Sequence, residues 1–289
     1  MRVAFSTCAD VPQLSRDDLH LVAPLRERGI EVVPWIWTDP GPPPGVNAVV
    51  HRSCWDYHEK PTAFLAWLDA LAASGLPSFN SVPLTRWNLD KRYLEDLYLR
   101  GVETPETLWI GQGARVSLAA LLRAHDFDEV VIKPQISLSA FETFRASRAT
   151  AASLQARFDA LVAERRMIVQ PYLPEIAVSG ELSFVFFNGI HSHTVRKLPR
   201  AGDFRVQQDH GGSRELCTAT PEQIAEVTTM LAAAPEPLLY ARVDVVETAG
   251  GLVLMELEAI DPELFLAMDP AAPQRFADSI ARAVAPAQA

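Results

Sequence analysis

Apolar and polar positions alternate with a changing period along the chain, and the first 85 residues combine strand and helix patterns. Two short apolar segments, Arg2–Ser6 and Glu31–Trp37, enclose a segment with helical spacing, Asp18–Arg28, that a glycine ends. Because strand, helix and strand follow one another closely, we expect a parallel sheet with a right-handed crossover. A proline-rich loop then leads to a third strand, Ala48–His51, and to an amphipathic helix, Pro61–Ser74.

The pattern changes twice further along the chain. Residues 88–166 mix helix and strand patterns, whereas strands dominate from Met167 onward, with Asn188-Gly189 as a hairpin turn signal. The predicted helices are Asn88–Arg100, Ser117–Ala124, Thr150–Arg165, Pro221–Ala233 and Pro273–Val284. The predicted strands are Thr107–Ile110, Val130–Lys133, Met167–Pro171, Leu182–Phe187, His191–Arg196, Leu239–Val246 and Leu252–Glu258. We therefore expect an α/β (α+β) protein of three parts, residues 1–87, 88–166 and 167–289.

The composition narrows the class of protein. The 289 residues carry a net charge of −10, which argues against nucleic acid or an anionic membrane surface as the main partner. No apolar run approaches the roughly 18 residues of a membrane-spanning helix, and the first residues lack a signal-peptide pattern, so we expect a cytoplasmic protein. Three scattered cysteines, Cys8, Cys54 and Cys217, predict reduced thiols. The oligomeric state stays open.

The most informative segment is Tyr240–Glu258, in which two predicted strands meet at a turn near Gly250. Alternate residues of a strand share a face, so Glu256 and Glu258 point the same way. Asp244 lies about as far before the turn as Glu256 lies after it. The pattern therefore predicts three carboxylates on one face of the sheet.

Such a cluster needs neutralising charge. Two carboxylates 4–5 Å apart repel by roughly 3–4 kcal/mol at an effective dielectric of 20, and all-oxygen ligands favour Mg²⁺ or Mn²⁺, which usually also bind phosphate. The alternative is a solvated sheet face of ordinary acids, paired with Arg242, which lies on the same face.

Phosphate also needs cations, and four candidates stand at strand ends or in loops: Lys91, Lys133, Lys197 and Arg205. A solvated side chain is the simpler interpretation of most of them. Lys133 differs because it closes the apolar segment Val-Val-Ile, where a charge is costly unless an anion meets it. The chain contains neither GxxxxGK[ST] nor GxGxxG, so a nucleotide would have to bind without a P-loop or a Rossmann cradle.

The order of these parts resembles the ATP-grasp superfamily, over nearly the whole chain and most specifically over residues 130–262. The resemblance implies an N-terminal α/β substrate domain over 1–87, a central lid subdomain over 88–166, and a C-terminal antiparallel-sheet subdomain with the metal site over 167–289. The nucleotide would lie between the lid and the C-terminal subdomain. The implied cofactors are ATP and two Mg²⁺ ions, with Mn²⁺ as an alternative.

The resemblance also implies a role for individual residues. The phosphates would be bound by Lys91, Lys133, Lys197, Arg205, Ser137, Ser139 and Gln207; the adenine by Gln170 and the backbone of Tyr172 and Leu173; the ribose by Glu181; and the metal ions by Asp244, Glu256 and Glu258. Lys133, Lys197 and Arg205 are the implied catalytic residues, with Arg205 also stabilising the tetrahedral oxyanion. Two features depart from the family pattern. Glu258 replaces the usual asparagine, and the loop after Lys133 contains no glycine.

Within the superfamily, the segments RSCWDY, WNLDKRYL, GELSFVFFNG, HTVRK and ELEAIDPELFL most resemble the ligases that form D-cycloserine and their uncharacterised relatives. That resemblance implies ATP-driven activation of the carboxylate of O-ureido-D-serine and ring closure by its own nitrogen. Ligation of two separate amino acids is the alternative within the class. A small-molecule kinase and a non-catalytic ATP-binding module are the alternatives outside it.

Residues after the third predicted strand are the candidate contacts to a small, amino-acid-like substrate, since α/β proteins place binding loops there. They are Arg52, Ser53, Trp55, Asp56 and Tyr57, together with Glu263 after the last predicted strand. Packing between domains is an equal interpretation of Trp55 and Tyr57. Asp261 is expected to be a turn residue.

Overall fold

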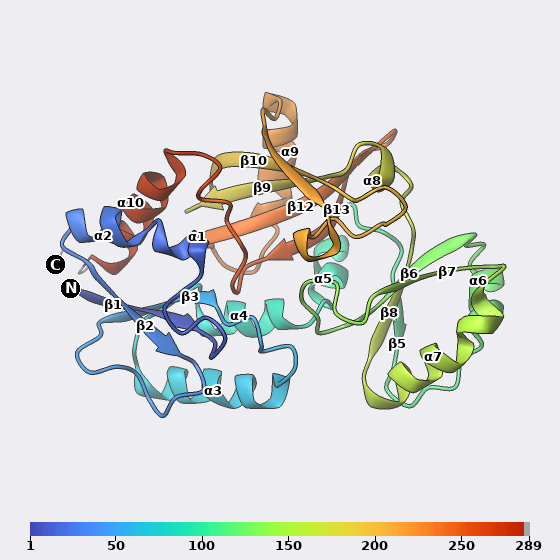
Figure 1. Ribbon diagram of the computed structural model, residues 1–289, viewed down its shortest axis with the longest axis horizontal. Helices are drawn as coiled ribbons and strands as arrows, with labels where there is room; N and C mark the ends of the chain where they lie inside the picture. The colour runs from blue at the N-terminus through green and yellow to red at the C-terminus, as the bar shows by residue number, and fades with distance from the viewer. Residues whose placement is uncertain (286–289) are drawn as a thin grey trace.

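The computed structural model describes residues 1–285, except for the side chain of Gln208. Three sheets form the framework (Figure 1): a parallel one near the N-terminus, an antiparallel one that holds the C-terminal strands, and a third at the opposite end of the molecule. The α/β (α+β) class is therefore confirmed. No helix within residues 1–285 is both long and apolar enough to cross a membrane.

The N-terminal sheet has the strand order β2-β1-β3-β4, all parallel. Its strands are β1 (Arg2–Thr7), β2 (Glu31–Ile36), β3 (Ala48–Ser53) and β4 (Ser78–Phe79), and its helices are α1 (Arg16–Leu19), α2 (Val22–Glu27) and α3 (Pro61–Ser74). The predicted helix Asp18–Arg28 is in fact two short helices. Ser15 caps the first of them, and Pro24 has no amide to continue it into the second.

The C-terminal sheet is antiparallel, in the order β11-β10-β9-β12-β13. Its strands are β9 (Glu181–Phe187), β10 (Ile190–Leu198), β11 (Ser213–Cys217), β12 (Tyr240–Thr248) and β13 (Gly251–Glu258); its helical elements are α8 (Glu175–Val178), η1 (Gln208–His210), α9 (Pro221–Ala232) and α10 (Ala272–Val284). The Asn188-Gly189 turn is confirmed, with φ of 51° and 74° at its two residues. The sequence pattern missed α8 and the edge strand β11.

The central sheet has the order β5-β8-β6-β7. It consists of β5 (Leu108–Ile110), β6 (Glu129–Pro134), β7 (Phe144–Ser147) and β8 (Met167–Pro171), covered by α6 (Leu118–Ala124) and α7 (Ala151–Glu164). These elements share a core of their own. Strand β8 pairs with β5 and β6, so the predicted boundary between residues 166 and 167 is wrong by the length of this strand.

The predicted helix Asn88–Arg100 is also wrong. Two helices, α4 (Val82–Leu89) and α5 (Tyr93–Leu99), are separated where Asp90 adopts an extended conformation. Leu84, Tyr93 and Leu97 pack into the core beneath the C-terminal sheet, so these helices belong structurally to that sheet and not to the central part. The break between them directs Lys91 toward the central sheet, where its amide donates to the Gln135 carbonyl over 3.0 Å.

The N-terminal and C-terminal sheets share one core. Phe5 and Val50 of the first sheet lie in the same apolar cluster as Phe187 and Tyr240 of the second. Phe276 of α10 stacks on Phe187 with 4.5 Å between ring centroids. These two parts are thus one rigid body against which the separately cored central part is set.

Two buried asparagines fix the end of β13 to the helices and strands around it. Asn80 donates to the carbonyls of Tyr240 (3.0 Å) and Ala259 (2.7 Å) and accepts from the amide of Leu239 (2.7 Å). Asn88 donates to the Leu257 carbonyl and accepts from the Ala259 amide, over 2.7 and 2.8 Å. The backbone on both sides of Glu258 is held in this way.

Replacement of Asn80 by Ala should lower the free energy of unfolding by about 3 kcal/mol, because it leaves three backbone groups unpaired in the core. Urea denaturation measures this change. Asn47→Ala is the matched control: Asn47 is exposed and accepts a single hydrogen bond, from the Arg2 amide, so its loss should cost no more than about 1 kcal/mol. Equal effects of the two substitutions would contradict the bracing role of Asn80.

His51 predicts a pH dependence of stability. The ring is fully buried between the hydroxyls of Ser6 and Ser78, and burial lowers its pKa from 6.5 to about 3. As the pH falls below 6.5 the unfolded chain takes up a proton that the folded protein does not, so stability is lost toward acid pH. Between pH 6 and 5, His51→Gln should reduce this slope by about 1.4 kcal/mol per pH unit. The exposed His20 provides the control: His20→Gln should leave the slope unchanged, and an unchanged slope in His51→Gln would refute the prediction.

Candidate active site

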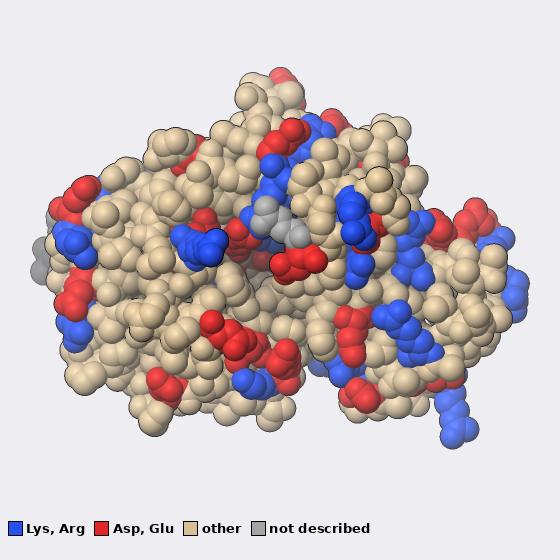
Figure 2. All heavy atoms as spheres, viewed as in Figure 1, with Lys and Arg blue, Asp and Glu red and all other residues tan. Residues whose placement is uncertain are grey.

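A cavity of about 560 Å³ opens where the three sheets meet. Figure 2 shows the corresponding hollow near the centre of the molecule, with acidic and basic side chains at its mouth. Fifteen of the predicted site residues line it: Lys91, Lys133, Ser137, Ser139, Gln170, Leu173, Glu181, Lys197, Arg205, Gln207, Asp244, Glu256, Glu258, Trp55 and Glu263. Residues from all three parts of the chain thus converge on one space.

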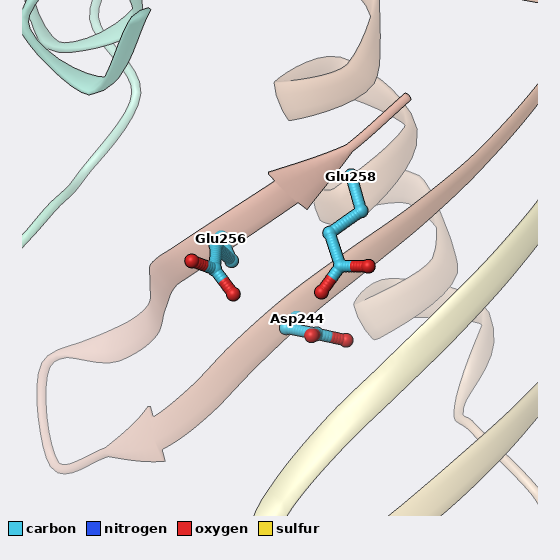
Figure 3. Close-up of side chains that lie close together, drawn as sticks. All are labelled: Asp244, Glu256 and Glu258. Atoms are coloured by element: carbon cyan, nitrogen blue, oxygen red, sulfur yellow. The ribbon is translucent and has the colours of Figure 1, made fainter. Parts of the chain in front are cut away.

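The three predicted carboxylates lie together on β12 and β13 (Figure 3). One oxygen from each of Asp244, Glu256 and Glu258 lies within 4.8 Å of the others. Asp244 pairs directly with Glu256 across the hairpin, as predicted.

This pairing depends on a β-bulge. The hairpin turns at Thr248 and Gly251, so regular pairing would place Met255 opposite Asp244; instead the register shifts between Asp244 and Val245. Met255 becomes the extra residue and also lines the cavity, beside Glu256. The bulge therefore presents the Glu256 carboxylate and the apolar Met255 side chain to the same space.

Cations compensate this acidic face. Asp244, 2% exposed, accepts hydrogen bonds from Ser183 (2.6 Å), Lys197 (3.0 Å) and Arg242 (3.0 Å). Burial opposes its ionisation, but Arg242 and Lys197 together hold its pKa well below the ordinary value. Arg242 also pairs with Glu258. The predicted pairing with Arg242 is therefore present, but Asp244 is buried and the two glutamates are half-buried, so this is not an exposed sheet face.

The two glutamates differ in charge state. Burial raises the pKa of Glu258 to about 7 despite the nearby Arg242. Glu256 is just as buried, yet Lys91 and then Lys133 lower its pKa to about 2; the ion pair with Lys91 measures 2.9 Å. Of the three carboxyls in the cluster, Glu258 is thus the one whose charge the protein compensates least, and a bound cation would compensate it further.

Lys133 is a half-buried cation without an ion pair within 4.0 Å among the described residues. Burial lowers its pKa, which is the cost of placing a lysine at the end of an apolar strand without a bound anion. Lys91 lies on the opposite side of this region, donating to the Ser137 carbonyl over 2.9 Å. The two lysines leave positive charge facing the cavity, as an anionic ligand requires.

Glu181 and Lys197 form an ion pair of 2.5 Å across β9 and β10. Gly180 makes their approach possible, because it has φ of +79° and a Cβ there would lie 2.4 Å from the Lys197 carbonyl oxygen. The Glu181 carboxylate, which was predicted to bind ribose, is therefore paired with Lys197 in this structure.

An apolar part of the cavity lies beside this ion pair. Leu173, Ile176, Val206 and Met255 line it, and these four belong to one small apolar cluster. Gln170 donates to the Thr107 hydroxyl over 2.9 Å at its edge. A flat, weakly polar ring such as a nucleobase fits a wall of this composition.

The prediction for Tyr172 needs correction. Its amide donates to the Glu129 carbonyl over 2.9 Å, and its ring lies under Arg145, 3.9 Å from the guanidinium carbon. Tyr172 is absent from the lining of the cavity. Sheet pairing with β6 therefore uses the backbone amide of Tyr172, one of the two backbones predicted to contact the adenine, whereas Leu173 does reach the cavity.

The loop after Lys133 closes one side of the cavity despite its lack of glycine. Ser139, Ala140 and Glu142 adopt φ of 50°, 57° and 50°, values that glycine tolerates best. Phe141 packs against His58 of the N-terminal part, 5.0 Å between ring centroids. Ser137 and Ser139 line the cavity as predicted.

Four of the predicted substrate contacts do not reach the cavity. Arg52 is 1% exposed and pairs with the equally buried Asp18 over 2.7 Å, and Ser53 donates to the same carboxylate. Asp56 accepts from the Trp37 indole over 2.6 Å, and Tyr57 stacks on Phe64. A buried acid on α1, which the sequence pattern did not reveal, turns this segment inward. Trp55 alone among the five lines the cavity.

Several lining residues were not predicted as site residues, and three of them lie close to the carboxylates in the sequence: Arg242, Met255 and Asp261. Arg242 was considered only as a partner of the acids, Met255 reaches the cavity through the bulge, and Asp261 was expected to be a turn residue. The position of Arg242 on the face of Asp244 was the one available signal in the sequence. Glu263 lines the cavity as predicted and pairs with Arg214.

Known proteins share both the sequence and the fold of this chain. Residues 104–264 match the model of the prokaryotic glutathione synthetase ATP-grasp domain, and residues 3–80 match that of the N-terminal domain of D-cycloserine synthetase DcsG. The chain is 31% identical over 258 residues to the cycloserine biosynthesis protein DcsG of Streptomyces lavendulae, which covers 83% of this chain and 84% of that protein.

The crystal structure of D-cycloserine synthetase DcsG superposes with a TM-score of 0.87 at 29% identity, covering 99% of this chain and 100% of that one. D-alanine–D-alanine ligase from Bacillus anthracis superposes with a TM-score of 0.70 at 16% identity, covering 98% and 97%; this second likeness shows the shared fold alone. The predicted resemblance is confirmed: the chain belongs to the ATP-grasp ligases, where D-cycloserine synthetase is among its relatives.

Proposed function

We propose that this ligase activates the carboxylate of a small amino acid for attack by a nitrogen, and that its reaction is the ring closure of O-ureido-D-serine to D-cycloserine. The observation that carries the proposal is the likeness to D-cycloserine synthetase over nearly the whole length of both chains, at 29% identity and a TM-score of 0.87. The cavity adds chemical support, because it joins three carboxylates, buried lysines and an apolar wall.

The residues present fit a divalent cation. Asp244, Glu256 and Glu258 offer oxygen donors within 4.8 Å of one another, and all-oxygen sites favour Mg²⁺ or Mn²⁺. Magnesium, when bound, would neutralise phosphate charge. The Lys91–Glu256 and Arg242–Glu258 ion pairs are the contacts that such an ion would compete with.

The protein's own part in the proposed reaction is positioning and charge compensation. Lys133 and Lys197 face the region where the transferred phosphoryl group of ATP would lie, and Arg205 lines the same cavity, held by Asp203 over 2.8 Å. A carboxylate oxygen of the substrate bonds to the γ-phosphorus and ADP departs. The substrate nitrogen then bonds to the activated carbonyl carbon and phosphate departs. For O-ureido-D-serine, this attack closes the ring as the attacking nitrogen loses its proton. A water molecule then cleaves the bond between that nitrogen and the carbamoyl carbon, and the carbamoyl group leaves as carbon dioxide and ammonia.

Water must be kept from the activated acid, since it would hydrolyse that intermediate. The loop through Ser137 and Ser139 is suited to this task because Phe141 bridges it to His58 on the far side of the cavity. Arg165 also lies over the Phe141 ring, 5.4 Å from its centroid. The contact ties the central part to the N-terminal part across the mouth of the site.

ADP release with Mg²⁺ and ATP across a panel of amino acids that includes O-ureido-D-serine, with products identified by mass spectrometry, tests the proposal. Turnover of O-ureido-D-serine alone, with the ring as product, is the expected result. A requirement for two different amino acids would replace ring closure by intermolecular ligation. A stable phosphorylated product would indicate a kinase, and ATP binding without any turnover would indicate a binding module.

Replacement of Glu256 by Gln should abolish turnover while the fold remains intact. Removing a group that merely orients a metal ligand costs 10–100-fold, so losing a ligand should cost more than about 100-fold. Initial rates of ADP release and far-ultraviolet circular dichroism measure the two properties. Glu247→Gln, an exposed glutamate of the same hairpin, is the control and should retain activity. Near-normal turnover in Glu256→Gln would remove the metal-site assignment.

A further inference from the structure

Asp261 is a buried acid in the wall of the active-site cavity, and one of its oxygens has no partner. The residue is 3% exposed, lines the cavity, and its Oδ2 atom lacks any hydrogen bond. Buried polar groups are nearly always paired. An unpaired carboxyl oxygen at a cavity wall therefore indicates a group that a ligand completes.

The backbone around Asp261 is fixed, so the carboxyl cannot move away to solvent. Its own carbonyl accepts from the Trp55 indole over 3.1 Å. On one side the Ile260 carbonyl accepts from the Tyr240 hydroxyl over 2.7 Å, and on the other the Pro262 carbonyl accepts from Arg52 over 3.0 Å. Three consecutive carbonyls thus accept hydrogen bonds from side chains, of which Tyr240 and Arg52 are buried and Trp55 is half-buried.

No cation within the described residues forms an ion pair with Asp261. The nearby Arg52 donates through Nε to Asp18 and through Nη2 to the Pro262 carbonyl, and its buried Nη1 has no hydrogen-bond partner, so Arg52 does not pair with the Asp261 carboxyl. Burial, and then the charge of Glu258, raises the pKa of Asp261 well above its ordinary value, and Arg52 offsets this only in part. The site around this carboxyl is therefore short of positive charge.

The other acids of this part of the wall are already satisfied. Asp17 accepts from the amides of Leu264 and Leu266, Glu263 pairs with Arg214, and Glu181 pairs with Lys197. Asp244, Glu256 and Glu258 form the carboxylate cluster assigned to the metal. Among the buried acids that line the cavity in residues 1–285, Asp261 is the one with a carboxyl oxygen that has no hydrogen bond.

We propose that Asp261 binds the ammonium group of the amino-acid substrate. The inference rests on the proposed function, in which the substrate carboxylate is activated beside the metal carboxylates. The α-ammonium group of an amino acid is one carbon away from that carboxylate, and Asp261 follows Glu258 by three residues on the same segment. A cation is the ligand that offsets a buried, uncompensated carboxylate.

Asp261 therefore acts as the residue that selects amino acids over plain carboxylic acids. The half-buried Trp55 indole, anchored on the Asp261 carbonyl, lines the cavity beside it and limits the space around the ammonium group. An acid that lacks the amino group would leave the carboxyl unpaired, and its activation would be correspondingly slower.

The test compares wild type with Asp261→Asn on two substrates. The first is the amino acid that the wild type turns over fastest, by our proposal O-ureido-D-serine. The second is its counterpart with hydrogen in place of the ammonium group, for O-ureido-D-serine 3-(ureidooxy)propanoic acid. In kcat/KM for ADP release, the wild type should prefer the amino acid by about 100-fold, the usual cost of breaking a buried charge pair. Asp261→Asn should reduce this preference to a few-fold and leave the KM for ATP unchanged.

Asp17→Asn is the matched control, since Asp17 lines the same wall but has both oxygens occupied by backbone amides. It should lower the thermal unfolding midpoint and keep the preference for the amino acid. Asp261→Asn should not lower that midpoint. A preference that survives in Asp261→Asn, or an equal loss on both substrates with a lowered midpoint, would overturn the role of Asp261 and leave the ligase function standing. Absence of turnover by the wild type with every amino acid tested would overturn the proposed function and this inference together.

Discussion

The arrangement of the active site depends on the need to compensate the charge of Asp244 inside the protein. This carboxylate is 2% exposed, and the groups that stabilise it come from three different strands: Ser183 on β9, Lys197 on β10 and Arg242 on β12. Since each strand neighbours the next in the sheet, the strand order itself brings the compensating groups together. A different order would leave a buried charge unpaired, at a cost of several kcal/mol.

The same network links the acidic face to the side of the cavity where we propose that the phosphates of ATP bind. Lys197 contacts both Asp244 and Glu181, and Lys91 joins Glu256 to the loop after Lys133. Lys91 and Lys197 each pair with an acid of the site and also line the cavity, where an anionic ligand would contact them. A ligand or metal would therefore replace ion pairs that already exist within the protein. These ion pairs balance the charge of the site, so the protein can fold without ligand or metal.

The central part of the chain can serve as a cover because it has its own core, whereas the N-terminal and C-terminal sheets share one. Asn80 and Asn88 hold the end of β13 against that shared core. The carboxylates that we propose to bind metal thus lie on the side of the cavity formed by the C-terminal sheet, and the Ser137–Ser139 loop lies on the other side. The charged groups are thus held in position by the shared core, and the separately cored central part can cover them.

Sequence reasoning predicted the carboxylate face and most of the cavity because both depend on local rules, the alternation of strand residues and the cost of a charge at a strand end. It placed Glu256 opposite Asp244 by assuming a symmetric turn, whereas the true turn is shorter and a bulge at Met255 restores the pairing. Arg52 was misassigned because its partner Asp18, far away in sequence, turns it inward. The Asp261 carboxyl was missed for the same reason. Trp55 and Tyr240, which are far away in sequence, hold the backbone around Asp261 in its buried position.

Crystals grown with Mn²⁺ and a non-hydrolysable ATP analogue would show whether Asp244, Glu256 and Glu258 hold divalent metal beside ATP. This metal assignment predicts anomalous scattering peaks from manganese in contact with oxygens of all three carboxylates, and the phosphates between those peaks and Lys133. Manganese bound elsewhere, or nucleotide bound with these carboxylates still paired only to Arg242, Lys197 and Lys91, would contradict it.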